Sequence, residues 1–296
     1  MEQKEPFFSI IIPTYNNTEQ LAICLQSVVD LDYPRDRFEV IVVDDGSDVP
    51  PEDVVHSFGK QLDITLLTQP NAGPAAARNT GVAQAKGECL AFTDDDCFPS
   101  VSWLSSLASC FLDAPDCAIG GRTINALSNN LFSTASQTII DFVYAYYNDD
   151  PRHARFLASN NLALPAKAFK VTGGFDPMLR TSEDRELCER WLHQGYRMIF
   201  APEAVIYHSH ALTFRTFWRQ HLNYGRGAFR FRRKLAQRDK TSIRLESKSF
   251  YLDLFRYPFS HHRKWSALKL SLLLLISQVA SAVGFMNEWI NQTRRR

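Results

Sequence analysis

Carboxylate side chains gather at two points in the sequence, each at the end of a mostly apolar run. Asp44 and Asp45 follow Phe38–Val43, and the triplet Asp94–Asp96 follows the run that ends at Phe92. Three adjacent carboxylates repel one another, so the triplet is costly without a cation. Hard divalent cations such as Mg²⁺ and Mn²⁺ take oxygen ligands, often one or two carboxylates together with substrate phosphates. The triplet therefore predicts a cation between the protein and a diphosphate, and a solvated acidic turn is the alternative.

Asp45 is suited to a different task at its strand end. An ionised carboxylate only accepts hydrogen bonds, so it fits the N–H edge of a nucleobase. Tyr15, which follows the apolar run Phe7–Pro13, could stack on that base. The alternatives are an ordinary turn, because Asp, Gly and Ser favour turns, and simple packing of the tyrosine.

Two further groups in the second half of the chain could take part in chemistry. Glu183 and Asp184 are adjacent carboxylates at the start of an expected helix, where acidic residues are also favoured for electrostatic reasons alone. His208 and His210 end a strand-like stretch, and strand alternation places both on one face. Neutral imidazole is a good ligand for Mn²⁺. We predict that His208 binds the metal, and a purely structural histidine is the alternative.

These groups need a scaffold that brings several strand ends together. The first 100 residues alternate apolar, β-branched runs with helix-like segments, the runs being 7–13, 38–43, 64–69 and 88–93. This alternation predicts an α/β fold with a mostly parallel sheet flanked by helices. Ligands of such sheets bind beyond the carboxyl ends of the strands. Helices are expected around Trp103–Leu112 and Asp184–Gln194, and a strand over 197–208, whereas Thr123–Asp150 carries no clear pattern.

Seven motifs occur in the order seen in a known family. They are SIIIPTYNN, VIVVDDGS, NAGPAAARNTGVAQAKGE, LAFTDDD, NNLALPAKAF-x-x-TGGFD, SEDRELCERWLHQGYR and AVIYHSH. Over about residues 7–212 the chain resembles the inverting family-2 glycosyltransferases of the Rossmann-like GT-A fold. The resemblance implies transfer of a sugar from a nucleotide-diphosphate donor, expected to be a UDP-sugar, to a hydroxyl of a glycan or lipid-linked acceptor. It also implies a divalent cation, Mn²⁺ or Mg²⁺.

The resemblance implies roles for single residues as well. Asp184 is similar to the family's catalytic base, and Asp96, Asp94 and His208 are similar to its metal ligands. The residues expected near the nucleotide are Pro13, Thr14, Tyr15, Asp45, Asn71, Gly73, Arg78, Asp94 and Asp95. Inverting transfer is a single displacement, so one general base suffices. Glu183 would raise the pKa of Asp184 by like-charge repulsion, which favours a base at neutral pH.

A pocket for the sugar or the acceptor is expected from residues around this pair. The candidates are Asn161, Gly174, Glu183 and Trp191. Gly173 and Gly174 predict a tight turn with positive φ or a close approach of substrate. For Asn161 and the glycines a purely structural role is the alternative. Trp191 lies on roughly the same helical face as Asp184, and a place in the core is the alternative for it.

The net charge of +1 hides two unlike parts. Residues 1–212 hold 15 Lys and Arg against 28 Asp and Glu, whereas residues 213–296 hold 18 against 4. We therefore predict a catalytic domain over 1–212 and a basic, aromatic, helical extension over 213–296. The extension includes 17 uncharged residues, Leu270–Met286, close to the ~20 that a membrane span needs.

Basic groups with interleaved aromatics favour a membrane surface. A span, a helix on one leaflet, an oligomerisation helix and a solvated helix face remain alternatives. A nucleic-acid surface is not expected, because no RNA- or DNA-binding signature is present.

The scattered cysteines, without a CxxC pair, predict reduced thiols and hence a cytosolic compartment. The charged start MEQKEPFF does not resemble a secretory signal. The expected location is thus the cytoplasmic face of a membrane, through a peripheral contact or a single C-terminal segment. Two other functions stay open. A sugar-nucleotide-forming nucleotidyltransferase would need a Gly-rich, basic loop after the first strand, where this chain has TYNNTEQ. A membrane-bound scaffold with a retired active site is the non-enzymatic alternative.

Overall fold

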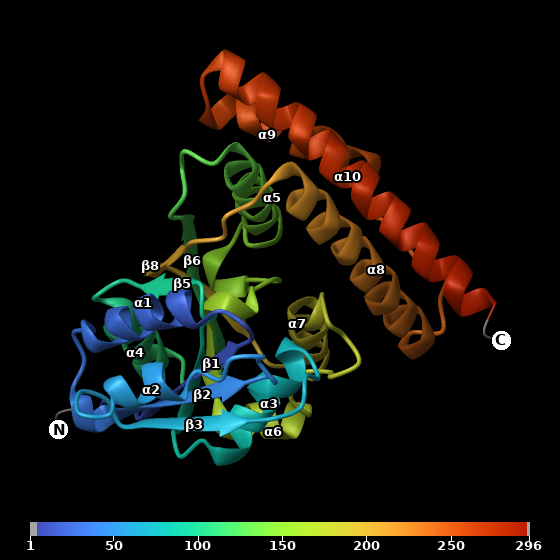
Figure 1. Cartoon of the computed structure of the whole chain (residues 1–296). Helices are drawn as coiled ribbons and strands as arrows, with labels where there is room; N and C mark the ends of the chain where they lie inside the picture. The colour runs from blue at the N-terminus through green and yellow to red at the C-terminus, as the bar shows by residue number, and fades with distance from the viewer. Residues whose placement is uncertain (1–4, 295–296) are drawn as a thin grey trace. The chain divides into compact units, whose positions relative to one another are not determined.

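The computed structural model describes residues 5–294, which divide into two compact units (Figure 1). The first unit comprises residues 5–124, Tyr147–Met178 and Glu183–Ser209. The second comprises Asn125–Tyr146, Leu179–Ser182 and residues 210–294. The division proposed from the sequence, 1–212 and 213–296, stays a proposal, and the second unit includes two segments that precede residue 212.

An eight-stranded sheet forms the centre of the first unit, in the order β3-β2-β1-β4-β7-β6-β8-β5. The first four strands in this order pair with one another in parallel. They are β1 (Phe8–Thr14), β2 (Phe38–Asp44), β3 (Ile64–Thr68) and β4 (Cys89–Phe92). Every residue of β1 and β2 is buried, as expected of central parallel strands that are covered on both faces.

Beyond β4 the sheet becomes antiparallel, so it is a mixed sheet. β7 pairs with β4 and β6, and β5 pairs with β8. These strands are β5 (Cys97–Pro99), β6 (Ala118–Asn125), β7 (Leu162–Pro165) and β8 (Met198–His208). The expected α/β fold and the strand over 197–208 are confirmed.

Helices flank this sheet. They are α1 (Thr18–Val29), α2 (Glu52–Ser57), α3 (Pro74–Gln84), α4 (Trp103–Asp113), α6 (Ala166–Thr172) and α7 (Glu183–His193), with short 3₁₀ turns at Arg35–Arg37, Pro151–His153 and Ser159–Asn161. The core between sheet and helices joins alternate residues of β1, such as Ile10 and Ile12, to Leu21 and Leu25 of α1 and to Trp103 of α4. The helices expected at 103–112 and 184–194 are confirmed within one or two residues.

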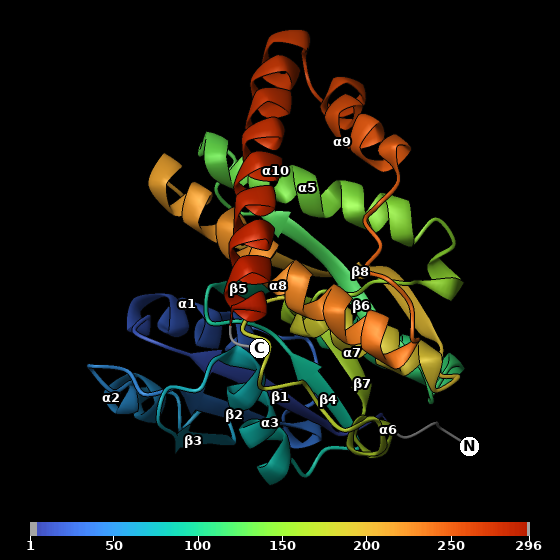
Figure 2. The same cartoon turned by 90° about the vertical axis from the view of Figure 1, so that its right-hand side faces the viewer.

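The second unit is helical. It contains most of α5 (Leu131–Tyr147), together with α8 (Phe214–Arg238), α9 (Lys248–His261) and α10 (Lys264–Thr293). In Figure 2 α9 and α10 form a helical hairpin. The run Leu270–Met286 lies inside α10, and of the described residues this one helix is long and apolar enough to cross a membrane by length and composition. α5 occupies much of the stretch that carried no clear pattern.

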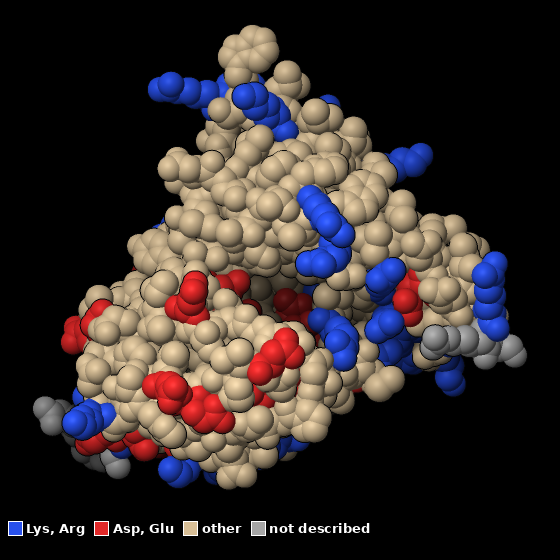
Figure 3. All heavy atoms as spheres, in the orientation of Figure 1, with Lys and Arg blue, Asp and Glu red and all other residues tan. Residues whose placement is uncertain are grey.

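The surface charges differ between the units in the way that the sequence indicates. On the face drawn in Figure 3, acidic side chains gather over the first unit, and Lys and Arg predominate on the second. The acidic groups of the first unit include those at the carboxyl ends of its strands, which the next section describes.

Candidate functional site

The carboxyl ends of β1 and β4 are joined through Asp95. Thr14 Oγ1 donates a hydrogen bond of 2.7 Å to Asp95 Oδ2, and Asn17 Nδ2 donates one of 2.9 Å to Asp95 Oδ1. Burial raises the pKa of Asp95 to about 7; the two hydrogen bonds oppose this shift, and the charges of Asp96 and Asp94 add to it. The middle carboxylate of the triplet is therefore held in place by groups from another strand end.

Asp45, at the end of β2, anchors the loop that leads into α3. It is buried and accepts hydrogen bonds from Gln69 Nε2 at 2.7 Å, Ala72 N at 2.9 Å and Gly73 N at 2.8 Å. Gly73 has φ of 93°, a conformation that favours glycine. A carboxylate offers roughly four acceptor positions, so three donors leave room for one more, such as a base N–H.

The other residues expected near the nucleotide lie at the same strand ends and in the same loop. Pro13 and Thr14 are buried at the end of β1, and Tyr15 directly after them is 50% exposed. Asn71 is exposed in the loop that Asp45 anchors. The exposed Tyr15 and Asn71 can be reached by a ligand, whereas Pro13 and Thr14 are buried.

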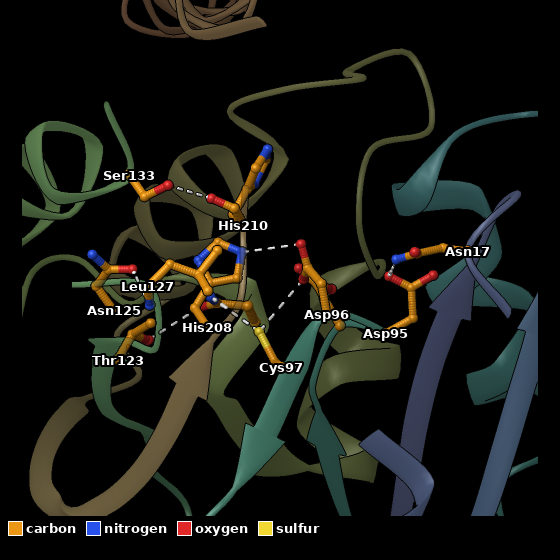
Figure 4. A network of polar contacts seen from close by, with 12 residues as sticks. Asn17, Asp95, Asp96, Cys97, Thr123, Asn125, Leu127, Ser133, His208 and His210 are labelled. Atoms are coloured by element: carbon orange, nitrogen blue, oxygen red, sulfur yellow. Dashed lines mark hydrogen bonds and ion pairs between the residues drawn. The ribbon is translucent and has the colours of Figure 1, made fainter. Parts of the chain in front are cut away.

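Asp96 lies against His208, 112 residues later (Figure 4). The antiparallel pairing of β5 with β8 sets Cys97 opposite His208, and Ser209 N donates to the main-chain oxygen of Asp96 at 2.8 Å. Asp96 Oδ2 and His208 Nε2 are 3.2 Å apart. Burial alone would lower the pKa of His208, but the hydrogen bond with Asp96 and the charges of the triplet raise it above its ordinary value.

This pair suits a divalent cation. Its two ligand atoms, a carboxylate oxygen and an imidazole nitrogen, lie close enough to hold one ion, and Mn²⁺ accepts both kinds of ligand. The partly buried, mutually repelling carboxylates of the triplet would also be stabilised by a positive charge. The residues present therefore fit a metal. His210, two positions further along the chain, belongs to the second unit.

Arg78 of α3 is a buried cation between two carboxylates. Its Nη2 lies 2.6 Å from Asp94 Oδ1, and its Nη1 lies 3.1 Å from Glu183 Oε1. Its guanidinium also stacks 5.4 Å from the centre of the Phe175 ring. Burial alone would lower the pKa of Arg78, but Asp94 and Glu183 raise it above its ordinary value. Arg78 thus ties the acidic triplet to the start of α7.

Asp184 follows Glu183 in the first turn of α7. Its Oδ1 accepts a hydrogen bond of 2.7 Å from Arg185 N. Desolvation and the charge of Glu183 raise the pKa of Asp184 to about 7, against the opposing effects of Arg185 and Arg78. The side chain keeps partial contact with solvent. A carboxylate with such a pKa can accept a proton near neutral pH.

Three of the pocket candidates, Asn161, Trp191 and Gly174, have contacts or backbone conformations that serve the fold itself. Asn161 is fully buried. Its Oδ1 accepts a hydrogen bond of 2.9 Å from Trp103 Nε1, and its Nδ2 donates one of 2.9 Å to the main-chain oxygen of Ala204. Trp191 is 1% exposed, with its Nε1 donating to a main-chain oxygen. Gly174 has φ of 70°, which confirms the predicted tight turn. Of the four candidates, Glu183 is the one that the structure brings to Asp184 and Arg78.

Sequence reasoning missed several partners of the site. Asn17 and Gln69 were not among the candidate site residues, yet they donate hydrogen bonds to Asp95 and Asp45. Arg78 was expected near the nucleotide, and its bridge between Asp94 and Glu183 was not foreseen. Arg78 and Glu183 are 105 positions apart in the sequence, so no local motif indicates that they meet.

Comparisons with known proteins agree on one family. Residues 9–173 match the family model described as Glycosyl transferase family 2. Glycosyltransferase AglE from Haloferax volcanii is 30% identical over 202 residues, which are 68% of this chain and 66% of AglE. The chain spans less than two thirds of the length of the first curated relatives that it matches.

Two solved structures share the fold. The mannosyltransferase PcManGT from Pyrobaculum calidifontis, in complex with GDP-Man and Mn²⁺, has a TM-score of 0.62 at 20% identity, over 99% of this chain and 81% of that chain. TarS 1–349 from S. aureus, in complex with UDP-GlcNAc, has a TM-score of 0.55 at 17% identity, over 98% of this chain and 92% of that chain. The fold is therefore the expected GT-A type.

Proposed function

The chain belongs to glycosyl transferase family 2, and on that premise we propose that it is an inverting glycosyltransferase with Asp184 as its general base. The observation that supports this role is the carboxylate pair at the start of α7. Glu183 and burial hold the pKa of Asp184 near 7, while Arg78 links the pair to Asp94 of the triplet. The proton acceptor is therefore tied to the residues proposed to face the donor.

The proposed reaction is a single displacement. Asp184 takes the proton of the acceptor hydroxyl as that oxygen bonds to the anomeric carbon of the donor. The bond from the anomeric carbon to the diphosphate oxygen breaks at the same time, and its electron pair leaves with the nucleoside diphosphate. Because one bond replaces another on the opposite side of the carbon, the configuration inverts. A positioned base contributes about 10²–10⁴-fold to such a step.

A divalent cation, Mn²⁺ or Mg²⁺, is proposed as cofactor. Asp96 and His208 would hold it, with Asp94 at the other end of the triplet. When bound, the cation offsets the negative charge that develops on the leaving diphosphate. Independently of the ion, Asp95 is kept in position by Thr14 and Asn17, and it is proposed to face the ribose or the sugar.

The donor is proposed to be a UDP-sugar, with its base between Tyr15 and Asp45 and its contacts extending to Asn71 and Gly73. The solved relatives bind GDP-Man in one case and UDP-GlcNAc in the other, so the base is the first property to test. The acceptor is proposed to be a hydroxyl of a glycan or lipid-linked glycan, at the cytoplasmic face of a membrane.

The experiment is a turnover assay with a panel of UDP- and GDP-sugars and Mn²⁺ or Mg²⁺, read as release of the nucleoside diphosphate and by NMR of the anomeric centre of the product. Asp184→Asn should lower turnover and leave UDP binding by calorimetry unchanged. Asp96→Ala should weaken metal-dependent UDP binding itself. A retained configuration in the product, or equal loss of UDP binding in Asp184→Asn, would contradict the proposal.

A further inference from the structure

The last helix, α10, carries a long apolar face that is exposed to solvent. Eight apolar side chains recur along it at steps of three or four residues and therefore share one face. Each is at least 40% exposed: Trp265, Leu268, Leu272, Leu275, Val279, Val283, Met286 and Ile290. At ~1.5 Å per residue they extend over about 38 Å of helix. Soluble monomers rarely expose an apolar patch of this extent, so an occupant is expected.

The opposite face of α10 is packed inside the second unit. Leu270 and Leu274 are buried, and Ser271 Oγ donates to the main-chain oxygen of Phe255 in α9 at 2.9 Å. Further along, α10 lies against α8 so closely that a Cβ on Gly284 would overlap the main-chain oxygen of Leu222. The helix is therefore covered by protein on one side and exposed on the other.

This packing argues against a span, although α10 alone has the length for one. α8 crosses α10 with its backbone in close contact and carries seven arginines, 215, 219, 226, 230, 232, 233 and 238. One of them, Arg230, is paired with Glu288 of α10, with Nε 2.9 Å from Oε1. A spanning α10 would bring α8 and its charges into the hydrocarbon region, where arginine is strongly disfavoured.

The charges around the apolar face favour one occupant. Arg263, Lys264 and Lys269 are exposed at its first end, and Arg294 is exposed at the other. Glu288, the one acidic residue of α10, is buried. Two copies of this face would bring like charges together without the acidic partners that flank a paired-helix seam. Anionic lipid headgroups would neutralise them instead.

We propose that α10 lies in the plane of an anionic membrane surface, with the face from Trp265 to Ile290 in contact with lipid. The basic residues at both ends then meet the headgroups. Trp265 and Trp289, which lie towards the two ends and are 79% and 47% exposed, sit at the depth that tryptophan favours.

The test is flotation of the full-length protein with vesicles of phosphatidylcholine alone or mixed with phosphatidylglycerol. The protein should float with the anionic vesicles, and less so as salt is raised, because salt screens surface charges. Leu272→Glu and Trp265→Glu should each weaken partitioning about tenfold or more, since each removes an apolar side chain from the contact. Lys264→Glu combined with Lys269→Glu should weaken binding to anionic vesicles specifically.

The matched control is Val171→Glu, which adds the same charge at an apolar residue of α6 that is 71% exposed. It should float like the wild type. Equal flotation of Leu272→Glu, Trp265→Glu and the wild type would overturn the proposal, provided that circular dichroism melting shows the variants folded. A lipid-free dimer that both face variants dissociate would assign the face to a second copy instead. Resistance to extraction with alkaline carbonate would assign it to a span. None of these measurements needs a sugar donor.

Discussion

Replacing Arg78 with methionine would remove the cation that separates Asp94 from Glu183. Arg78 is 2% exposed, so neither water nor salt can replace it easily. Breaking a buried ion pair by deleting one partner costs about 3–5 kcal/mol. The side chain of Glu183 is 10% exposed, but that of Asp94 is 30% exposed and can regain part of its hydration. We therefore expect a loss of about 3 kcal/mol in the free energy of unfolding, at the lower end of that range.

The assay is urea unfolding at pH 7.5 in EDTA, which keeps metal binding out of the comparison. Arg152→Met, at an exposed arginine, is the control and should stay within about 0.5 kcal/mol of the wild type. The double variant Arg78→Met with Glu183→Gln should recover part of the loss, because one of the two uncompensated carboxylates is then neutral.

The same substitution should act on the proposed base. Arg78 lowers the pKa of Asp184, so its removal should move the acid limb of the pH–rate profile to higher pH. Arg78→Lys keeps the charge and should move the limb less. A loss below about 1 kcal/mol, strict additivity in the double variant, or an unmoved acid limb would refute the role of Arg78 as a bridge.

Three further outcomes are expected. Asp184→Asn should lower kcat about 10²–10⁴-fold in the turnover assay. The pKa of Asp95 is raised to about 7 in the folded protein, so between about pH 4 and pH 7 the folded state binds a proton that the unfolded state does not. The free energy of unfolding in EDTA should therefore fall as pH rises from about 4 to about 7. Asp95→Asn should flatten that slope in urea titrations. Gly284→Ala should destabilise the protein by about 1–3 kcal/mol, because its Cβ meets Leu222, whereas Gly59→Ala, whose Cβ has room, should leave the thermal midpoint nearly unchanged.

The sequence by itself determined the elements whose spacing is local. β1 and β2 are mostly apolar, β-branched runs, so their burial on both faces could be predicted. The acidic triplet, the strand ends and the family resemblance were equally visible. The predicted turn at Gly173–Gly174 needed no more than the two glycines, which have φ of 94° and 70°.

Only the tertiary structure decided which of these residues meet. Asp96 reaches His208 because β5 pairs with β8, and Arg78 reaches Glu183 because α3 and α7 are brought to the same end of the sheet. It also showed that Asn161 and Trp191 are packed in the interior. Spacing along the chain shows which side of an element is apolar, but what covers that side depends on segments far away in sequence. For the same reason the uncharged run Leu270–Met286 could not show whether its helix is able to span a membrane. That depends on what packs against the helix, and the structure shows that α8 does.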